Sequence, residues 1–338
     1  MKKLFLMTAL LLSSLFAMAQ QNHVVWREGR VLYAMPVNSM DSITFMDDAD
    51  QMDTLYMLLP RTMVRVDTVY VHDTIYKCPD DPDDPDAPQV IEFSVANDRR
   101  VLFASGNLQY TQSTNSWAFA AQQYEVLGTA NFAADGQLAD KIDLFGWSGS
   151  TGLAQWGIGV RTDSIGYSGS FVDWGKNIED GKTWRTLTID EWLYVANFRT
   201  NAADLIGIAR IKLNEEGTEY VNGTILLPDS WTCPQGVTFT PGYGSAFSIE
   251  AYAEHQVFTL QEWTLLEKAG AVFFPAAGYR YQATNNYDWM AAGQYWTASE
   301  MTNRKISAQF MDFEPTRSHW DYDHRIRGRS VRLVKDLW

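Results

Sequence analysis

Short runs of apolar residues, separated by turn-forming residues, dominate the chain from residue 89 onward. β-Branched and aromatic residues are frequent in these runs, which favours strands over helices. The predicted strands lie at 91–95, 101–104, 224–227, 272–274, 305–311 and 330–334. Apolar residues repeat at helical spacing in only two segments, 186–197 and 259–270. Few helices among many short strands with glycine- and aromatic-rich connections predict an α+β domain with long loops.

Both predicted helices begin with a capping box, in which a threonine and a glutamate three residues later bond each other's backbone. The first pair is Thr188 and Glu191, and the second is Thr259 and Glu262. The apolar face of the first helix consists of Ile189, Trp192, Leu193 and Ala196. Gly270 is expected to end the second helix as its C-cap. Both glutamates are therefore predicted to be capping residues and not a catalytic acid/base pair.

The N-terminal pattern is that of an exported protein. Two lysines precede the apolar stretch 4–16, and Ala17 and Ala19 fit the small-x-small cleavage rule. This pattern predicts a secretory signal peptide at residues 1–19. No later stretch approaches the about 18 consecutive apolar residues of a membrane-spanning helix. We therefore expect a protein that is secreted or associated with the cell surface or outer membrane, with the periplasm as the remaining alternative.

Two segments are predicted between the signal peptide and a large domain at residues 89–338. Residues 20–50 read as a small β module, with a β-meander at 23–46. Such a short unit buries too little apolar surface to be stable alone, so we expect residues 23–46 to contact a surface-assembly partner. Residues 51–88 are predicted to form an extended stalk that ends in an acidic linker, because its prolines block regular structure and its aspartates repel one another.

A short Asp-Ser/Thr-apolar triplet recurs along the chain. The triplets begin at Asp41, Asp53, Asp67, Asp73 and Asp163. They resemble the O-glycosylation acceptor pattern of exported Bacteroidota proteins, and most of them lie in or before the stalk, where a modifying enzyme can reach them. The alternative is that they are ordinary strand-edge sequence.

Composition and charge narrow the function classes. The 338 residues carry a formal net charge of −14, which argues against a nucleic-acid or anionic-membrane partner, because phosphate neutralisation needs an excess of lysine and arginine. Two cysteines exclude a disulfide-dense scaffold and a cysteine-rich zinc site. A disulfide between Cys78 and Cys233 would fasten the linker to the domain. The 13 tryptophans indicate either a heavily packed core or a binding surface.

Several motifs of the large domain stand in an order that is similar to a known family. The motifs occupy residues 106–110, 142–147, 183–192, 221–231, 270–280, 295–299 and 328–334. Over residues 92–335 the chain resembles exported Bacteroidota proteins related to the Fibrobacter succinogenes major paralogous domain. The resemblance implies a C-type-lectin-like fold, as in formylglycine-generating enzymes and the variable proteins of diversity-generating retroelements. It implies less about activity, because one fold hosts unrelated functions.

The residues that carry chemistry in related folds are not matched here. A formylglycine-generating site needs a cysteine pair in the C-terminal half, where Cys233 stands alone. The calcium site of C-type lectins resembles Glu314-Pro315-Thr316 only in part, and Trp320-Asp321 follows at too short a spacing. The histidines and aspartates of residues 319–324 are interpreted as a solvated polar loop, with a cation site as the alternative. No catalytic residue, metal or cofactor is predicted.

The strongest functional signal is an aromatic stretch with polar neighbours between Tyr279 and Tyr322. In the variable proteins of similar fold, this C-terminal region forms the ligand face. The residues expected to be exposed there and to bind a glycan or protein ligand are Tyr287, Trp289, Trp320 and Tyr322. The alternating arginines 325, 327 and 329 either make one face of a terminal strand basic or offset the acidic residues of the domain.

The sequence thus predicts an exported, non-catalytic ligand-binding protein. One alternative is a structural, fimbria-associated surface subunit that assembles through residues 23–46. The second alternative is a carbohydrate-active enzyme, which would require two carboxylates that face each other across a cleft.

Overall fold

The structure is a computed structural model that describes residues 91–150, 155–159, 169–281 and 285–337, with Gln155 and Asn285 as backbone alone. Before residue 91 it describes the backbone of four short strands. The chain divides into two units, Met1–Pro82 and Asp83–Trp338. The predicted signal peptide and acidic linker lie outside the described residues.

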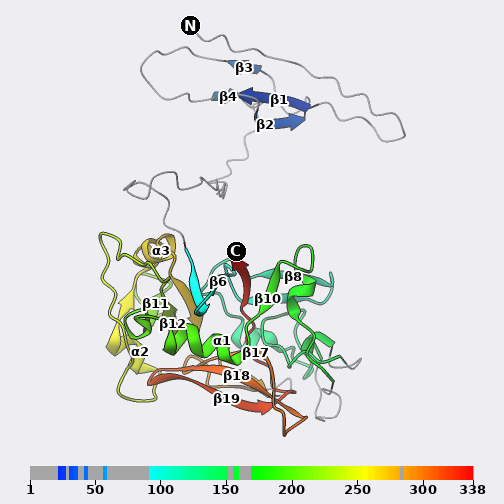
Figure 1. Ribbon diagram of the computed structural model, residues 1–338, viewed down its shortest axis with the longest axis vertical. Helices are drawn as coiled ribbons and strands as arrows, with labels where there is room; N and C mark the ends of the chain where they lie inside the picture. Colours follow the sequence, from blue (N-terminus) through cyan, green and yellow to red (C-terminus); the bar gives the residue numbers. More distant parts are fainter. Residues whose placement is uncertain are drawn as a thin grey trace. The chain divides into compact units, whose positions relative to one another are not determined.

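The first unit contains two antiparallel pairs of strands (Figure 1). β1 (Asn22–Arg27) pairs with β2 (Arg30–Pro36), and β3 (Ser42–Thr44) pairs with β4 (Tyr56–Leu58). The first three strands lie within the predicted module of residues 20–50. β4 lies in the segment predicted as stalk, so strand pairing extends beyond that module.

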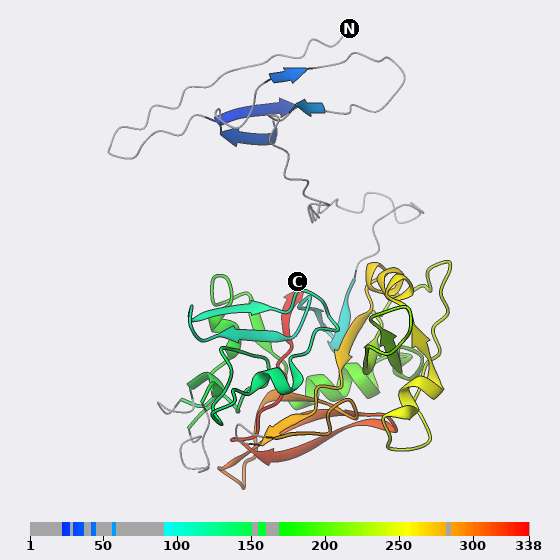
Figure 2. The same ribbon diagram turned by 180° about the vertical axis from the view of Figure 1, so that it is seen from behind.

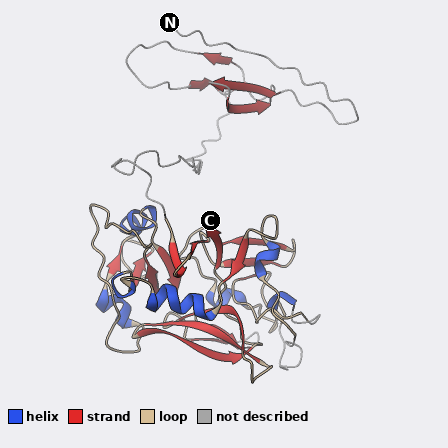
Figure 3. Cartoon of the chain, viewed as in Figure 1, coloured by secondary structure: helices blue, strands red, loops and turns tan. Residues whose placement is uncertain are grey.

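The second unit is a mixed α+β structure whose strands form several small sheets (Figure 3). Helices account for 17% and strands for 38% of the structure, which confirms the predicted class with few helices. The first four-stranded sheet has the order β10 (Trp184–Thr186), β20 (Leu333–Leu337), β6 (Arg99–Phe103), β5 (Phe93–Ala96). The second has the order β13 (Val257–Phe258), β11 (Ile206–Lys212), β12 (Tyr220–Leu226), β14 (Val272–Pro275).

Three smaller sheets complete this unit. One has the order β17 (Gly293–Glu300), β18 (Ser307–Glu314), β19 (Arg317–His324). Another has the order β8 (Ser116–Phe119), β7 (Leu108–Thr111), β9 (Lys141–Ile142), and a third pairs β15 (Tyr279–Tyr281) with β16 (Asn285–Tyr287). These pairings are all antiparallel, whereas β11 and β13 of the second four-stranded sheet run parallel.

The two predicted helices are present, and their capping boxes are confirmed. α1 (Ile189–Leu193) follows Thr188 and continues as the π-helix η6 (Tyr194–Phe198), and α3 (Leu260–Lys268) follows Thr259. In each box the threonine oxygen accepts from the glutamate N–H, and the glutamate carboxylate accepts from the threonine N–H. Gly270, at φ +92°, follows α3 as expected.

One α-helix and several 3₁₀ helices were not predicted. α2 (Glu250–His255) has only six residues, too few for helical periodicity to mark it in the sequence, and its capping contact runs from the Ala251 N–H to Ser248 Oγ at 3.1 Å. The 3₁₀ helices are η2 (Gly128–Asn131), η3 (Gln155–Gly157), η5 (Trp174–Asn177) and η7 (Ala202–Asp204).

α1 lies along the β17–β18–β19 sheet, as both ribbon views show (Figures 1 and 2). Trp192 of α1 is fully buried. The centroid of its ring lies 5.4 Å from that of Phe274, 6.0 Å from that of Tyr295 and 5.7 Å from that of Phe313. Aromatic rings at these separations in edge-to-face or tilted geometry are favourable beyond the area they bury. The predicted apolar face of the first helix therefore anchors this sheet to the core.

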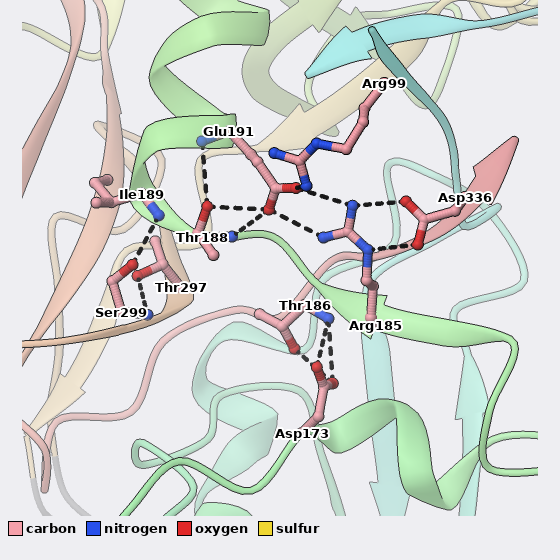
Figure 4. A network of polar contacts seen from close by, with 10 residues as sticks. All are labelled: Arg99, Asp173, Arg185, Thr186, Thr188, Ile189, Glu191, Thr297, Ser299 and Asp336. Atoms are coloured by element: carbon pink, nitrogen blue, oxygen red, sulfur yellow. Dashed lines mark hydrogen bonds and ion pairs between the residues drawn. The ribbon is translucent and has the colours of Figure 1, made fainter. Parts of the chain in front are cut away.

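A buried carboxylate fastens the start of α1 to strands distant in sequence (Figure 4). The Glu191 side chain is 2% exposed and forms ion pairs with Arg99 at 2.7 Å and Arg185 at 2.9 Å. Arg185 also binds Asp336 of β20 at 2.7 Å. Burial raises the pKa of Glu191, but Arg185 and the Thr188 N–H outweigh that effect and leave the pKa lowered. Glu191 is therefore a charged structural residue.

Candidate functional site

The register of the β17–β18–β19 sheet sorts its side chains onto two faces, because alternate residues of a strand point to opposite sides. Tyr295 pairs with Met311, and Met311 pairs with Trp320, so these three share the face that packs on α1, called here the helix face. The opposite face, called here the acidic face, carries residues from all three strands. Its members include Gln294, Phe310, Asp312, Glu314, His319, Asp321 and Asp323.

Two of the predicted ligand-binding residues lie on the helix face. Trp320 is 43% exposed on β19, the edge strand of the sheet. Tyr322 is half-buried, with the Arg304 guanidinium 4.7 Å from its ring centroid. The interpretation of residues 319–324 as a solvated loop is wrong, because these residues pair with β18 as part of an eight-residue strand.

The other two predicted residues lie elsewhere. Tyr287 ends β16, is 42% exposed, and stacks on Tyr279 with ring centroids 5.3 Å apart. Trp289 is half-buried, and its ring packs so closely on Gly128 that a Cβ there would lie 2.7 Å from it. The four predicted residues therefore do not share one surface.

Tyr279 connects the Tyr287 stack to the acidic face. The Arg329 guanidinium lies 5.0 Å from the Tyr279 ring centroid and 3.8 Å from that of Phe310, and it bonds Asp323 at 2.8 Å. Phe310 and Asp323 both belong to the acidic face. Tyr279 and Tyr287 therefore adjoin the acidic face, whereas Trp320 and Tyr322 point to the helix face.

Tyr279, Tyr281, Tyr287 and Arg327 form a group called here the tyrosine cluster. The Arg327 guanidinium lies 3.9 Å from the Tyr281 ring centroid and 5.7 Å from that of Tyr279. Tyr279 and Tyr281 share one side of β15 because they stand two residues apart. That two-residue spacing is the signal in the sequence for their association. The four residues predicted to bind a ligand did not include Tyr279 or Tyr281.

Three potential metal-ligating side chains converge on the acidic face. One ligand atom each from Asp312, Glu314 and His319 lies within 4.8 Å of the others. Asp312 is 6% exposed, and its Oδ2 accepts a hydrogen bond from Gln294 at 3.1 Å. Asp312 Oδ1 and His319 Nδ1 are buried and have no hydrogen-bond partner within the part of the chain that the structure describes.

The surroundings of this cluster perturb its protonation. Burial first, and Glu314 next, raise the pKa of Asp312 to about 7, while Arg329 opposes the rise. Burial likewise lowers the pKa of His319 and raises that of Asp288, the latter also affected by Glu314. Each shift disfavours the charged form of a group that the surrounding protein removes from part of its contact with water. The cluster therefore holds its negative charge at an electrostatic cost, which a bound cation would reduce.

The predicted basic strand face at residues 325–329 is wrong. Arg325 and Arg329 are both 2% exposed. Arg325 bonds the Gly169 carbonyl at 2.8 Å and pairs with Glu300 at 3.3 Å, and Arg329 bonds Gln294 at 3.0 Å. Both guanidiniums pair with acidic residues of the domain, Arg325 with Glu300 and Arg329 with Asp323, as the alternative of offsetting the domain's acids requires. Arg327 is the one of the three that keeps partial exposure.

Of the two residues in the predicted disulfide, the structure describes Cys233 and not Cys78. Cys233 is exposed and forms no disulfide with any residue that the structure describes. Its Sγ lies 3.4 Å from the Val237 carbonyl oxygen. Cys78 lies outside the described residues, so their pairing stays a prediction.

No family model, curated protein or solved structure matches this chain. Among the described residues, no helix combines the length and apolar character needed to cross a membrane.

Proposed function

We propose that this chain is an exported, non-catalytic protein that binds a glycan through the tyrosine cluster. The observation that carries the proposal is the exposed Tyr287 ring, which stacks on Tyr279. The Arg327 guanidinium lies against the Tyr279 and Tyr281 rings, and Asp288 follows Tyr287 in the chain. A rigid aromatic pair provides a flat apolar surface at low entropic cost, and neighbouring charged groups provide directional hydrogen bonds.

The chemistry of the cluster favours a glycan. One face of a sugar ring is lined by C–H groups, which pack against aromatic rings, and its hydroxyls bond to guanidinium and carboxylate groups. Arg327 is half-buried beside two tyrosine rings and pairs with Asp323 at 3.4 Å. Asp288, directly after Tyr287, is exposed. Both kinds of polar group therefore lie beside the aromatic surface.

We also propose a C-type-lectin-like fold for the second unit. What supports it is that four motifs of the family resemblance meet in space. Backbone bridges join Phe145 to Arg329, Arg280 to Gly328, and Tyr295 to Ser330. Motifs that are far apart in sequence thus build one framework beneath the tyrosine cluster, as the resemblance implies.

The arrangement of the converging carboxylates supports the non-catalytic proposal over a carbohydrate-active enzyme. A glycosidase places two carboxylates on either side of the scissile bond, where substrate contacts both. Asp312 is 6% exposed and is bonded to Gln294. The ligand oxygens of Asp312 and Glu314 lie within 4.8 Å of each other on one face of β18, closer than the roughly 5 to 9.5 Å that separate the two carboxylates of a glycosidase. The alternative of an assembling surface subunit rests on residues 23–46, of which the structure describes only backbone.

The test is a screen of the full chain on an array of immobilised glycans and extracellular proteins, followed by calorimetry on each hit. We expect a glycan hit whose affinity falls roughly 30-fold in Tyr287→Ala, since a central aromatic contact contributes about 2 kcal/mol.

Trp320→Ala is the matched control, because Trp320 has nearly the same exposure on the helix face. We expect this variant to bind as the unmodified chain does. Binding that Tyr287→Ala leaves intact, or hits confined to proteins, would contradict the proposal.

A further inference from the structure

We propose that Asp312, Glu314 and His319 form a binding site for one divalent transition-metal cation, with Zn²⁺ or Mn²⁺ as its occupant. This site is separate from the tyrosine cluster and does not depend on glycan binding.

The strand register holds the three side chains together. Asp312 and Glu314 stand two residues apart on β18 and share its acidic face. His319 lies directly opposite Asp312 in the β18–β19 pairing. A two-residue turn at Pro315 and Thr316 joins the strands, since Glu314 pairs with Arg317. The ligand atoms are therefore positioned by a rigid hairpin and not by a loop.

The separations fit a single ion. Two atoms bound to the same Zn²⁺ ion cannot be farther apart than twice the metal–ligand distance, which is about 4.0 to 4.4 Å for distances of about 2.0 to 2.2 Å. The three ligand atoms all lie within 4.8 Å of one another. They can therefore bind one ion with small side-chain adjustments.

An independent observation also points to a missing ligand. Asp312 is only 6% exposed and therefore 94% buried, yet its Oδ1 has no hydrogen-bond partner among the described residues. Buried carboxylate oxygens without a donor are rare in folded proteins. The buried guanidinium of Arg329 donates to Asp323 and Gln294 instead. A metal ion would satisfy this oxygen.

The neighbouring contacts are those that orient metal ligands. Gln294 donates to Asp312 Oδ2 at 3.1 Å, and Arg317 donates to Glu314 Oε2 at 3.0 Å. The other oxygen of Glu314, Oε1, lies 4.0 Å from His319 Nε2. One oxygen of each carboxylate is thus fixed by a donor, while the other remains for an ion. Such outer contacts set ligand orientation in metal sites.

The ligand types favour a transition metal over calcium. Ca²⁺ takes six to eight oxygen ligands, whereas imidazole nitrogen suits Zn²⁺ and other transition metals. One imidazole with two carboxylates leaves further coordination positions for water. Mn²⁺ accepts such mixed nitrogen and oxygen sets as well, and its paramagnetism makes it a direct probe.

The test is titration of the EDTA-treated full chain with Zn²⁺, Mn²⁺ and Ca²⁺ at pH 7.5, by calorimetry and, for Mn²⁺, by electron paramagnetic resonance. We expect one tight site for Zn²⁺ or Mn²⁺ and weaker binding of Ca²⁺. Asp312→Asn and His319→Ala should each weaken that site at least tenfold. His324→Ala is the matched control, because His324 is exposed on the same strand but on the helix face.

A thermal melt provides a second measurement. Saturating metal should raise the melting temperature of the unmodified chain and the His324→Ala variant but not of the two ligand variants, because an ion that binds only the folded state stabilises it. If Asp312→Asn does not fold, His319→Ala and Glu314→Gln decide the question, since both residues are partly exposed. Equal metal binding by all variants, or none by the unmodified chain, would overturn the proposal.

Discussion

Replacing Glu191 by Gln tests whether the buried ion-pair network is needed to hold α1 in place. Glutamine keeps the size of the side chain and can still serve in a capping box. It removes the charge and turns one acceptor oxygen into a donor amide. The substitution therefore probes the ion pairs with Arg99 and Arg185 with little change of packing (Figure 4).

The magnitude follows from the bonds that each oxygen accepts. Oε1 accepts from Arg99 and Arg185, and Oε2 accepts from Arg185 and from the Thr188 N–H and hydroxyl. Whichever oxygen becomes an amide, at least two bonds are lost, and the charged ones contribute about 1.5 kcal/mol or more each. We expect a loss of about 3 kcal/mol of unfolding free energy, the lower end of the range for breaking a buried ion pair.

The assay is urea unfolding followed by tryptophan fluorescence, with thermal melting in parallel. A loss of about 3 kcal/mol corresponds to a drop in melting temperature of roughly 6 to 12 °C for a domain of this size. Glu262→Gln is the matched control, because Glu262 occupies the same position in the second capping box but has no arginine partner among the described residues. We expect that control to lose less than about 1 kcal/mol.

The pH dependence gives an independent check. The pKa of Glu191 is lowered, so its stabilising charge is fully present above the ordinary glutamate pKa of about 4.3 and is lost as the pH falls through the lowered value. The difference between the unmodified chain and Glu191→Gln should therefore be full at pH 7 and shrink below pH 4. Equal losses for the Glu191 and Glu262 variants would refute the reasoning.

Three further predictions concern packing, backbone and a buried acid. Trp192→Ala should cost about 3 to 5 kcal/mol in urea unfolding, because it empties the centre of the aromatic core. Gly278→Ala, at φ +65° with the Tyr287 carbonyl against its Cβ, should lose about 2 kcal/mol more than Gly242→Ala, whose surroundings are open. Burial raises the pKa of Asp143 to about 6, so melting temperature should fall as pH rises from 4 to 7, and Asp143→Asn should flatten that slope.

The elements that the sequence predicted correctly are those determined by local chemistry. A threonine and a glutamate three residues apart, directly before residues with helical apolar periodicity, predict a capping box, and both boxes formed as expected. The apolar face of α1 likewise needs only helical periodicity, and Trp192 lies at its centre in the core. Local chemistry did not predict the environment of each cap. Glu191 is buried against Arg185 and against Arg99 of the distant strand β6, whereas the Glu262 cap stays near the surface.

The tryptophans show the same division between local and distant determinants. Trp192 and Trp296 of the family-like motifs are buried, as a structural role requires, whereas Trp184 and Trp231 of these motifs are half-buried. Trp289 was expected to be exposed because asparagine and aspartate surround it, yet its ring packs on the Gly128 backbone from a segment about 160 residues away. The polar residues beside Trp289 in the sequence predict only its local strand or loop. They do not predict which distant segment packs against its ring.

The register of the β18–β19 hairpin explains two findings. It explains why residues 319–324 form a strand and not the predicted loop, and why the three side chains of the proposed metal site converge. Two-residue hairpin turns usually carry glycine, asparagine or aspartate, and Pro315-Thr316 carries none of these, so the sequence gives no hairpin signal there. Once Glu314 pairs with Arg317, every other pair is determined, and His319 must face Asp312. The same pairing turns a polar stretch into an edge strand and sends Trp320 to the helix face, away from Tyr287. Metal binding lost in His319→Ala but kept in His324→Ala would therefore test this register as well as the site.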